Sequence, residues 1–196
     1  MGKYVVAITG ASGCIYGFRI AVELLKADHE VYLIVTDTGR KFMERELSAS
    51  FSALVSRLDN IETGMLHIEE ADNLFSVLAT GTFEVDGMII APCAMGTLGQ
   101  IASGAGSNLI IRAADVCLKE RRKLILITRE TPLNAIHLEN MLRLTHAGAV
   151  ILPPSPSFYS HPESLGEIIN EIVGKALTML GVENTIFKRW DNRLRK

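Results

Sequence analysis

Short apolar runs alternate along this chain with longer segments whose apolar residues recur at helical spacing. Runs that are rich in β-branched residues and bounded by turn residues predict buried strands. Five runs are of this kind, at residues 4–9, 30–36, 85–91, 124–128 and 149–152. Because they are continuously apolar and alternate with helical segments, they predict an α/β fold with a parallel sheet covered on both faces.

The segments between these runs predict the helices of the fold. They are residues 15–26, 37–47, 95–103, 108–120, 134–146 and 163–180. The second begins at Thr36 or Asp37, either of which can cap a helix. Residues 48–84 have the least clear pattern and are expected to hold a helix between loops, and Pro92 is expected to end the third strand. No linker interrupts the chain, so we expect one domain over residues 1–196.

The first strand runs into a glycine-rich turn, YVVAITGASGCIYG, at residues 4–17. Gly10, Gly13 and Gly17 permit positive φ angles and a close approach of the backbone to a ligand. A strand, such a turn and a helix together place free backbone N–H groups at a helix N-terminus, which binds phosphate. The turn therefore favours a nucleotide or flavin phosphate over a turn that binds nothing.

Composition narrows the classes of function. The hydrophobic fraction is 48%, yet no apolar run is long enough to cross a bilayer, so we expect a homo-oligomer that buries apolar surface and binds no membrane. A net charge of −2 gives no electrostatic drive towards nucleic acid. The three cysteines and five histidines lack disulfide or metal-ligand spacing, so no metal is expected. The chain begins without a leader pattern, which favours a cytoplasmic protein.

Ligands of such sheets bind beyond the carboxyl ends of the strands. The residues that follow the five strands are Gly10 to Ser12, Thr36 and Asp37, Pro92 to Thr97, Arg129 and Glu130, and the loop with Phe158 and Tyr159. This edge is rich in hydroxyls and small residues and has few acids. It suits a phosphorylated cofactor with a flat ring.

A nicotinamide-dependent reductase is the first alternative. The turn TGASGCIYG is close to that of extended short-chain dehydrogenases, and Asp37 lies where a ribose-binding acid is expected. That class also depends on a Tyr-x-x-x-Lys pair, and no tyrosine of this chain has a lysine four residues later. The sequence therefore argues against this class.

Four stretches resemble the UbiX-type flavin prenyltransferases, in the branch associated with aromatic-acid decarboxylases. They are TGASGCIYG, APCAMGTLGQIASG, the long stretch from NLIIRAADVCLKERR through RETPLNAIHLENML to PPSPSFY, and KRW. The resemblance covers nearly the whole chain. It implies a flavodoxin-like or Rossmann-like three-layer sandwich that assembles as a homododecamer, with the tail at about residues 182–196 packing on a neighbouring subunit.

The resemblance also implies the reaction. A dimethylallyl group from dimethylallyl phosphate would be joined to N5 and C6 of reduced FMN, without a metal ion. The product, prenylated FMN, would serve a UbiD-type decarboxylase as partner. Cationic side chains would then have to stabilise the departing phosphate.

Site residues follow from the same resemblance. Those that would contact FMN are Gly10, Ala11, Ser12, Thr36, Ala94, Met95, Gly96, Thr97 and Arg129. Those that would bind the dimethylallyl phosphate are Tyr159, Lys175, Arg112, Lys119 and Trp190. The catalytic residues would be Ser12 near flavin N5, Glu46 in proton transfer, Lys119 and Glu130.

From the residues alone, several of these positions have plainer interpretations. Arg112 and Lys119 share one helix face that solvent or a subunit could cover, and Lys175 and Glu46 resemble ordinary surface charges. Trp190 could be an interface anchor only. The chain also departs from many family members at Ala94, where a serine hydroxyl is lost. Lys175 replaces an arginine and so loses its planar fork.

Two other classes share features with this chain. FMN-dependent cysteine decarboxylases have the same fold, but the histidine after the second strand and the P-x-S/A-x-N-T-I-A-K segment of that class are absent from this sequence. A non-catalytic flavin-binding subunit of a decarboxylase is the second. Glu46, Lys119, Tyr159 and Lys175 together argue against it, since flavin binding alone does not need all four.

Overall fold

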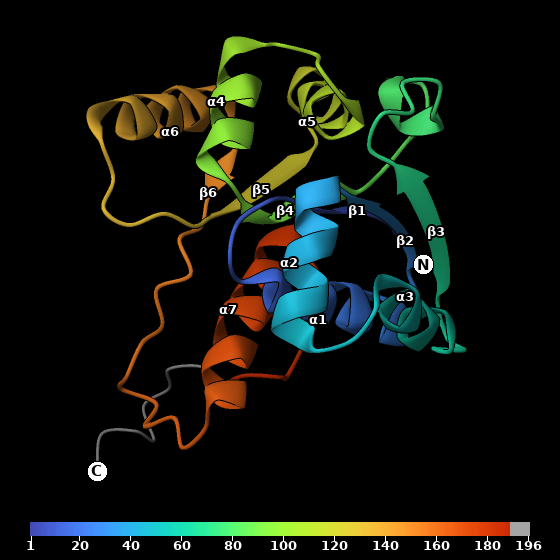
Figure 1. Cartoon of the computed structure of the whole chain (residues 1–196), viewed down its shortest axis with the longest axis vertical. Coiled ribbons are helices and arrows are strands. Elements are labelled where there is room, and N and C mark those ends of the chain that lie inside the picture. Colours follow the sequence, from blue (N-terminus) through green and yellow to red (C-terminus); the bar gives the residue numbers. More distant parts are fainter. Residues whose placement is uncertain (189–196) are drawn as a thin grey trace.

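A computed structural model describes residues 1–188 and shows a six-stranded parallel sheet (Figure 1). The strands are β1 (Lys3–Ile8), β2 (Glu30–Val35), β3 (Met65–Glu70), β4 (Gly87–Cys93), β5 (Lys123–Thr128) and β6 (Val150–Ile151). Their order is β3-β2-β1-β4-β5-β6, which is the doubly wound order of dinucleotide-binding folds. The predicted α/β three-layer sandwich is confirmed.

Helices cover both faces of the sheet. They are α1 (Cys14–Lys26), α2 (Asp37–Leu47), α3 (Phe51–Asp59), α4 (Met95–Ser103), α5 (Leu109–Lys119), α6 (Ala135–Ala147) and α7 (Leu165–Leu180), with a short 3₁₀ turn η1 (Val77–Ala79). Figure 1 shows α4, α5 and α6 on one side of the strands and α1 and α7 on the other. Each side has its own buried cluster, built on alternate strand residues.

The strand β1 shows why the sequence pattern is continuous rather than alternating. Val6 and Ile8 pack with α1 and α7, while Val5 and Ala7 pack with α4 and α5. All four are at most 1% exposed. A strand that buries both faces needs apolar residues at every position.

The strand β3 was missed by the pattern. Residues 48–84 contain the expected helix, α3, but also this sixth strand, which pairs with β2 at the edge of the sheet. Its sequence, MLHIEE, is partly charged and none of its residues is buried. An edge strand with an open face carries little apolar signal, which explains the omission.

The strand β4 extends further than expected. Pro92 does not end it, because the strand continues to Cys93, with a register irregularity between Ile90 and Cys93. The Pro92 carbonyl accepts hydrogen bonds from both the backbone N–H and the hydroxyl of Thr9. Proline removes a donor from the strand but not this acceptor, so β4 stays joined to the end of β1.

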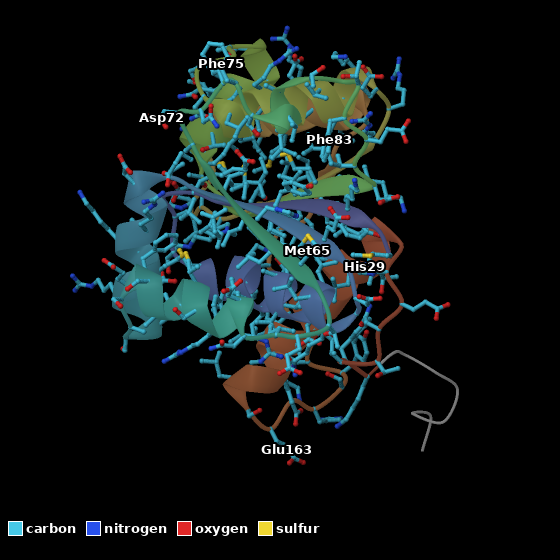
Figure 2. All side chains as sticks on the ribbon, turned by 90° about the vertical axis from the view of Figure 1, so that its right-hand side faces the viewer. His29, Met65, Asp72, Phe75, Phe83 and Glu163 are labelled. Atoms are coloured by element: carbon cyan, nitrogen blue, oxygen red, sulfur yellow. The ribbon has the colours of Figure 1, made fainter. Side chains whose placement is uncertain are left out.

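Two labelled residues in Figure 2 mark the carboxyl and the amino ends of the parallel strands. Asp72, just past the carboxyl end of β3, lies on the left, and His29, just before β2, lies on the right. Within residues 1–188, no helix combines the length and the apolar character that crossing a bilayer requires. Residues 182–188 pack along α7 of the same chain, where the Asn184 amide donates to the Gly174 carbonyl (3.1 Å). The predicted contact of the tail with another subunit also involves residues 189–196, which lie outside the described part of the chain.

Candidate functional site

The chain builds the sheet outwards from β1 in two directions, with β2 and β3 on one side of β1 and β4, β5 and β6 on the other. The turns after β1 and β4 therefore diverge and leave a crevice at the carboxyl edge. Thr9 joins these two turns, because its hydroxyl donates to the Pro92 carbonyl (2.8 Å) and accepts from the Ala94 N–H (2.9 Å). This buried threonine was not among the predicted site residues, although it stands within the TGASG turn.

The glycine-rich turn leads from β1 into α1 as predicted, but only Gly13 of its three glycines has a positive φ, and the N–H groups expected to be free for a phosphate are occupied. Gly13 has φ 102° and precedes α1 without offering a side-chain cap. Glu46 of α2 acts in place of a capping side chain. Its carboxylate accepts hydrogen bonds from the N–H groups of Gly13 (3.0 Å) and Cys14 (2.9 Å). A carboxylate is favourable at the positive end of a helix. Glu46 is thereby held against the turn that carries Ser12.

The N-terminus of α4 is different, because no side chain caps it. Ala94 at the capping position has no hydroxyl, and within residues 1–188 the N–H groups of residues 95–97 have no hydrogen-bond acceptor. By contrast, helices α2, α3, α5, α6 and α7 each begin with a capping side chain. These are Thr36, Ser50, Asn108, Asn134 and Ser164, respectively. A Cβ atom on Gly96 would meet nothing within 4 Å. This end of α4 is therefore open to an anion.

The next strand adds a hydroxyl and a cation to the same edge. Thr128 ends β5 opposite Cys93, is 4% exposed, and its hydroxyl has no hydrogen-bond partner in the described part of the chain. A buried polar atom without a partner indicates a missing ligand or water. Arg129 follows, exposed, with its N–H on the Cys93 carbonyl (3.3 Å). These groups suit a phosphorylated ligand lying across β1, β4 and β5.

Tyr159 and Lys175 come together at a cavity of about 490 Å³ beyond the carboxyl end of β6. The proline-rich loop supplies Tyr159 and helix α7 supplies Lys175, while Ser155 and Thr178 add hydroxyls. Lys175 has no ion pair among the described residues. An unpaired ammonium beside a phenol is suited to a phosphate group.

Other predicted residues lie at the carboxyl edge but have structural contacts of their own. The Thr36 hydroxyl caps α2 by accepting from the Gly39 N–H (3.0 Å), and Thr36 also lines a cavity of about 290 Å³ with Asp37 and Asn108. Glu130 accepts from the Thr131 N–H (3.0 Å) and is exposed.

Of two further predicted cations, Lys119 is not brought to this edge within one chain, and Arg112 is already paired. Lys119 ends α5 shortly before β5 begins, so it lies at the amino edge, where its ammonium contacts Glu120. The Arg112 guanidinium pairs with Asp115 (2.7 Å) and donates to the Ala79 carbonyl (3.0 Å). Trp190 lies outside the described residues.

The three cysteine thiols are buried and free. Burial raises the pKa of Cys93 and Cys117 to about 12, and burial together with the Glu46 charge raises that of Cys14 to about 12. Because the thiolate is the nucleophile, these thiols are unreactive near neutral pH. Cys93 is therefore a packed thiol rather than a nucleophile.

We expect iodoacetamide to leave the native protein unmodified at pH 8 and to label all three cysteines after denaturation. Each thiol has a higher pKa in the folded than in the unfolded chain. At a pH between these two values, the folded chain therefore binds more protons than the unfolded chain. The free energy of unfolding should therefore fall as the pH rises from about 8.5 towards about 12. Intact-mass measurement after alkylation checks the first point, and rapid labelling of a native thiol would contradict it.

Fold and site together define a class: a doubly wound α/β protein with an open crevice at its switch point that suits a phosphorylated ligand. A family model described as Flavoprotein matches residues 2–177. The flavin prenyltransferase UbiX of Methanocaldococcus jannaschii is 45% identical over 188 residues, covering 96% of this chain and 98% of the relative. That of Chlamydia pneumoniae is 45% identical over 98% of this chain and 99% of the relative. The chain belongs to the UbiX family of flavin prenyltransferases.

Solved structures agree with this family. A crystal structure of AnUbiX (PadA1) in complex with FMN and dimethylallyl pyrophosphate has a TM-score of 0.91 and 37% identity, covering 97% of this chain and 98% of that one. A dodecameric FMN-dependent UbiX-like decarboxylase from Escherichia coli O157:H7 has a TM-score of 0.89 and 36% identity, covering 97% of this chain and 100% of that one. The peptidyl-cysteine decarboxylase EpiD, at 18% identity and a TM-score of 0.59, shares the fold alone.

Proposed function

We propose that this protein transfers a dimethylallyl group from dimethylallyl phosphate to reduced FMN. The bond from the allylic carbon to the phosphate oxygen breaks, and that carbon bonds to flavin N5, which loses its proton. The donor's double bond is then protonated as its other end bonds to C6, which loses its proton in turn, so the flavin gains one C₅H₈ unit as inorganic phosphate leaves. The observation that carries the proposal is that Tyr159 and Lys175 line one cavity beyond the carboxyl end of β6. The function of relatives 45% identical over nearly the full length supports it.

The carboxyl edge fits FMN as the flavin substrate. The open N-terminus of α4 and Arg129 would hold the FMN phosphate, and the Thr128 hydroxyl would gain a partner. The space above Gly96 leaves room for the ligand. Reduced FMN supplies the nucleophilic N5, and Ser12 would lie near it with Glu46 behind the turn to move a proton.

The chain's cations would offset the charge on the departing phosphate. Lys175 and Tyr159 would hold the phosphate in the cavity, and Lys119 or Arg112 would reach a site from a neighbouring copy. A homododecamer would supply such copies, and the similarity to a dodecameric neighbour supports that assembly. Exposed apolar residues of α6, including Ile136 (66%) and Leu142 (59%), would be covered in it.

Two further proposals concern the protein's setting. The free thiols suit a reducing compartment, so we propose a cytoplasmic location. A UbiD-type decarboxylase would receive the prenylated FMN. An FMN-dependent decarboxylase remains the alternative function, because the Escherichia coli neighbour is described as one.

A phosphate-release assay tests the proposed function. Under anaerobic conditions, inorganic phosphate should be released from dimethylallyl phosphate only in the presence of protein and reduced FMN. Oxidised FMN is the control, since its N5 is an electron-poor, imine-type nitrogen that does not attack the allylic carbon. Release that does not depend on reduced FMN, or carbon dioxide release from cysteine peptides instead, would contradict the proposal.

The Lys175→Ala variant is expected to raise the KM for dimethylallyl phosphate about 10- to 100-fold, since a charge-assisted hydrogen bond to phosphate is lost. The FMN affinity should stay unchanged. Lys175→Arg keeps the charge and should stay within about 3-fold of the wild type. Lys26→Ala, at the far end of α1, is the matched control. An unchanged KM in Lys175→Ala would remove Lys175 from the donor site.

A further inference from the structure

Ser157 and Glu171 form a contact that the site as described does not use. The Ser157 N–H lies 3.2 and 3.3 Å from the two carboxylate oxygens of Glu171, and the Ser157 hydroxyl also donates to Glu171 Oε1. Fourteen residues separate them in sequence. The contact fastens the proline-rich loop to helix α7.

Glu171 lies on the same face of α7 as Lys175, one turn earlier, and both side chains line the Tyr159 cavity. A glutamate four residues before a lysine is the favourable order for an ion pair along a helix. No such pair forms among residues 1–188, and the Glu171 carboxylate is instead held by Ser157, which contacts both of its oxygens. The lysine is left available although an acid is within one helical turn.

We propose that Ser157 is a positioning residue for the prenyl donor: it holds the Glu171 carboxylate away from Lys175, so that Lys175 can bind the donor's phosphate. This inference rests on the proposed function. Without the Ser157 hydroxyl, the carboxylate keeps only its contact with the backbone N–H of residue 157. It is then less firmly held, and its turning towards Lys175 competes with the phosphate for the ammonium group. The contact also fixes the loop two residues before Tyr159, which keeps the phenol at the same cavity.

The test is the affinity of the FMN-bound protein for dimethylallyl phosphate, measured by calorimetry with oxidised FMN so that no transfer takes place. Ser157→Ala should weaken the affinity about 5-fold, the cost of competition from one ion pair. Glu171→Gln keeps an acceptor for Ser157 but has no charge, so its affinity should equal or exceed that of the wild type. The double variant should return to within about 2-fold of the wild type.

The double variant separates positioning from mere support of the loop. If Ser157 only supports the loop, the double variant binds as weakly as Ser157→Ala or more weakly, and the proposal is overturned. An unchanged affinity in Ser157→Ala also overturns it. In turnover, the effect should be on the KM for the donor and not on kcat.

Hydrogen exchange checks the contact without any ligand. The Ser157 amide should exchange faster in Glu171→Ala than in the wild type, because its acceptor is gone. An unchanged rate would contradict the contact. Failure of the proposed function gives a different result from failure of this inference. If the proposed function is wrong, wild-type protein does not bind dimethylallyl phosphate or does not modify the flavin. If only this inference is wrong, wild-type protein still does both.

Discussion

The Glu46→Gln variant is expected to bind FMN about as tightly as the wild type and to form prenylated FMN about 100-fold more slowly, the usual contribution of a positioned proton donor or acceptor. Glutamine keeps one oxygen to accept from the N–H groups of Gly13 and Cys14, so the turn that carries Ser12 should remain in place. It cannot carry a proton between flavin and phosphate. Flavin fluorescence titration and single-turnover product formation measure the two effects separately.

Glu44→Gln provides the matched control. Glu44 lies on the same helix and its carboxylate also accepts from the backbone N–H of a helix start, that of Phe51 in α3 (2.8 Å). It does not touch the glycine-rich turn. Its turnover should stay within about 2-fold of the wild type, since it carries no proton. A Glu46→Gln variant as fast as Glu44→Gln would remove Glu46 from the reaction.

The Gly17→Ala variant is expected to lose about 3 kcal/mol or more of its free energy of unfolding, the upper range for overpacking. A Cβ atom at this position would lie 2.1 Å from the Ala91 carbonyl oxygen and 2.7 Å from Ile8 Cγ1. Neither α1 nor the buried ends of β1 and β4 can move aside without opening the core. The melting temperature should fall by about 10 °C, measured at equal protein concentration with and without FMN.

Gly166→Ala is the control for this effect. Gly166 lies in the first turn of α7, where the nearest atom to an added Cβ is the Ser164 hydroxyl oxygen at 3.6 Å. Alanine should leave the stability unchanged or raise it by about 0.4 to 1 kcal/mol. If Gly17→Ala melts as Gly166→Ala does, the close approach of α1 to β4 is not as described.

Most of the fold could be predicted because most strands and helices are encoded by short stretches of sequence. Short, continuously apolar runs such as 124–128 that are rich in leucine and isoleucine indicate strands buried on both faces, and the glycine-rich turn after residues 4–9 indicates a βα unit. The strand β3 could not be predicted in this way, since its open face lets it carry His67 and two glutamates. The end of β4 was misjudged because the Pro92 carbonyl still pairs with Thr9.

The candidate site likewise contains some residues that the sequence could place and others that it could not. The sequence predicts residues that follow strands, such as Ser12 and Arg129, because topology alone brings them to the carboxyl edge. It cannot predict contacts that depend on how distant elements pack, such as Ser157 with Glu171. It also cannot place Lys119, which lies at the opposite edge of its own chain, because the nearest active site to that side chain depends on the assembly.

The mass of the flavin after an anaerobic reaction tests the central claim most directly. The protein is mixed with chemically reduced FMN and dimethylallyl phosphate, or with the diphosphate, and the released flavin is weighed by mass spectrometry. We predict a gain of one C₅H₈ unit with at least one of the two donors. A flavin of unchanged mass with both donors would contradict the account.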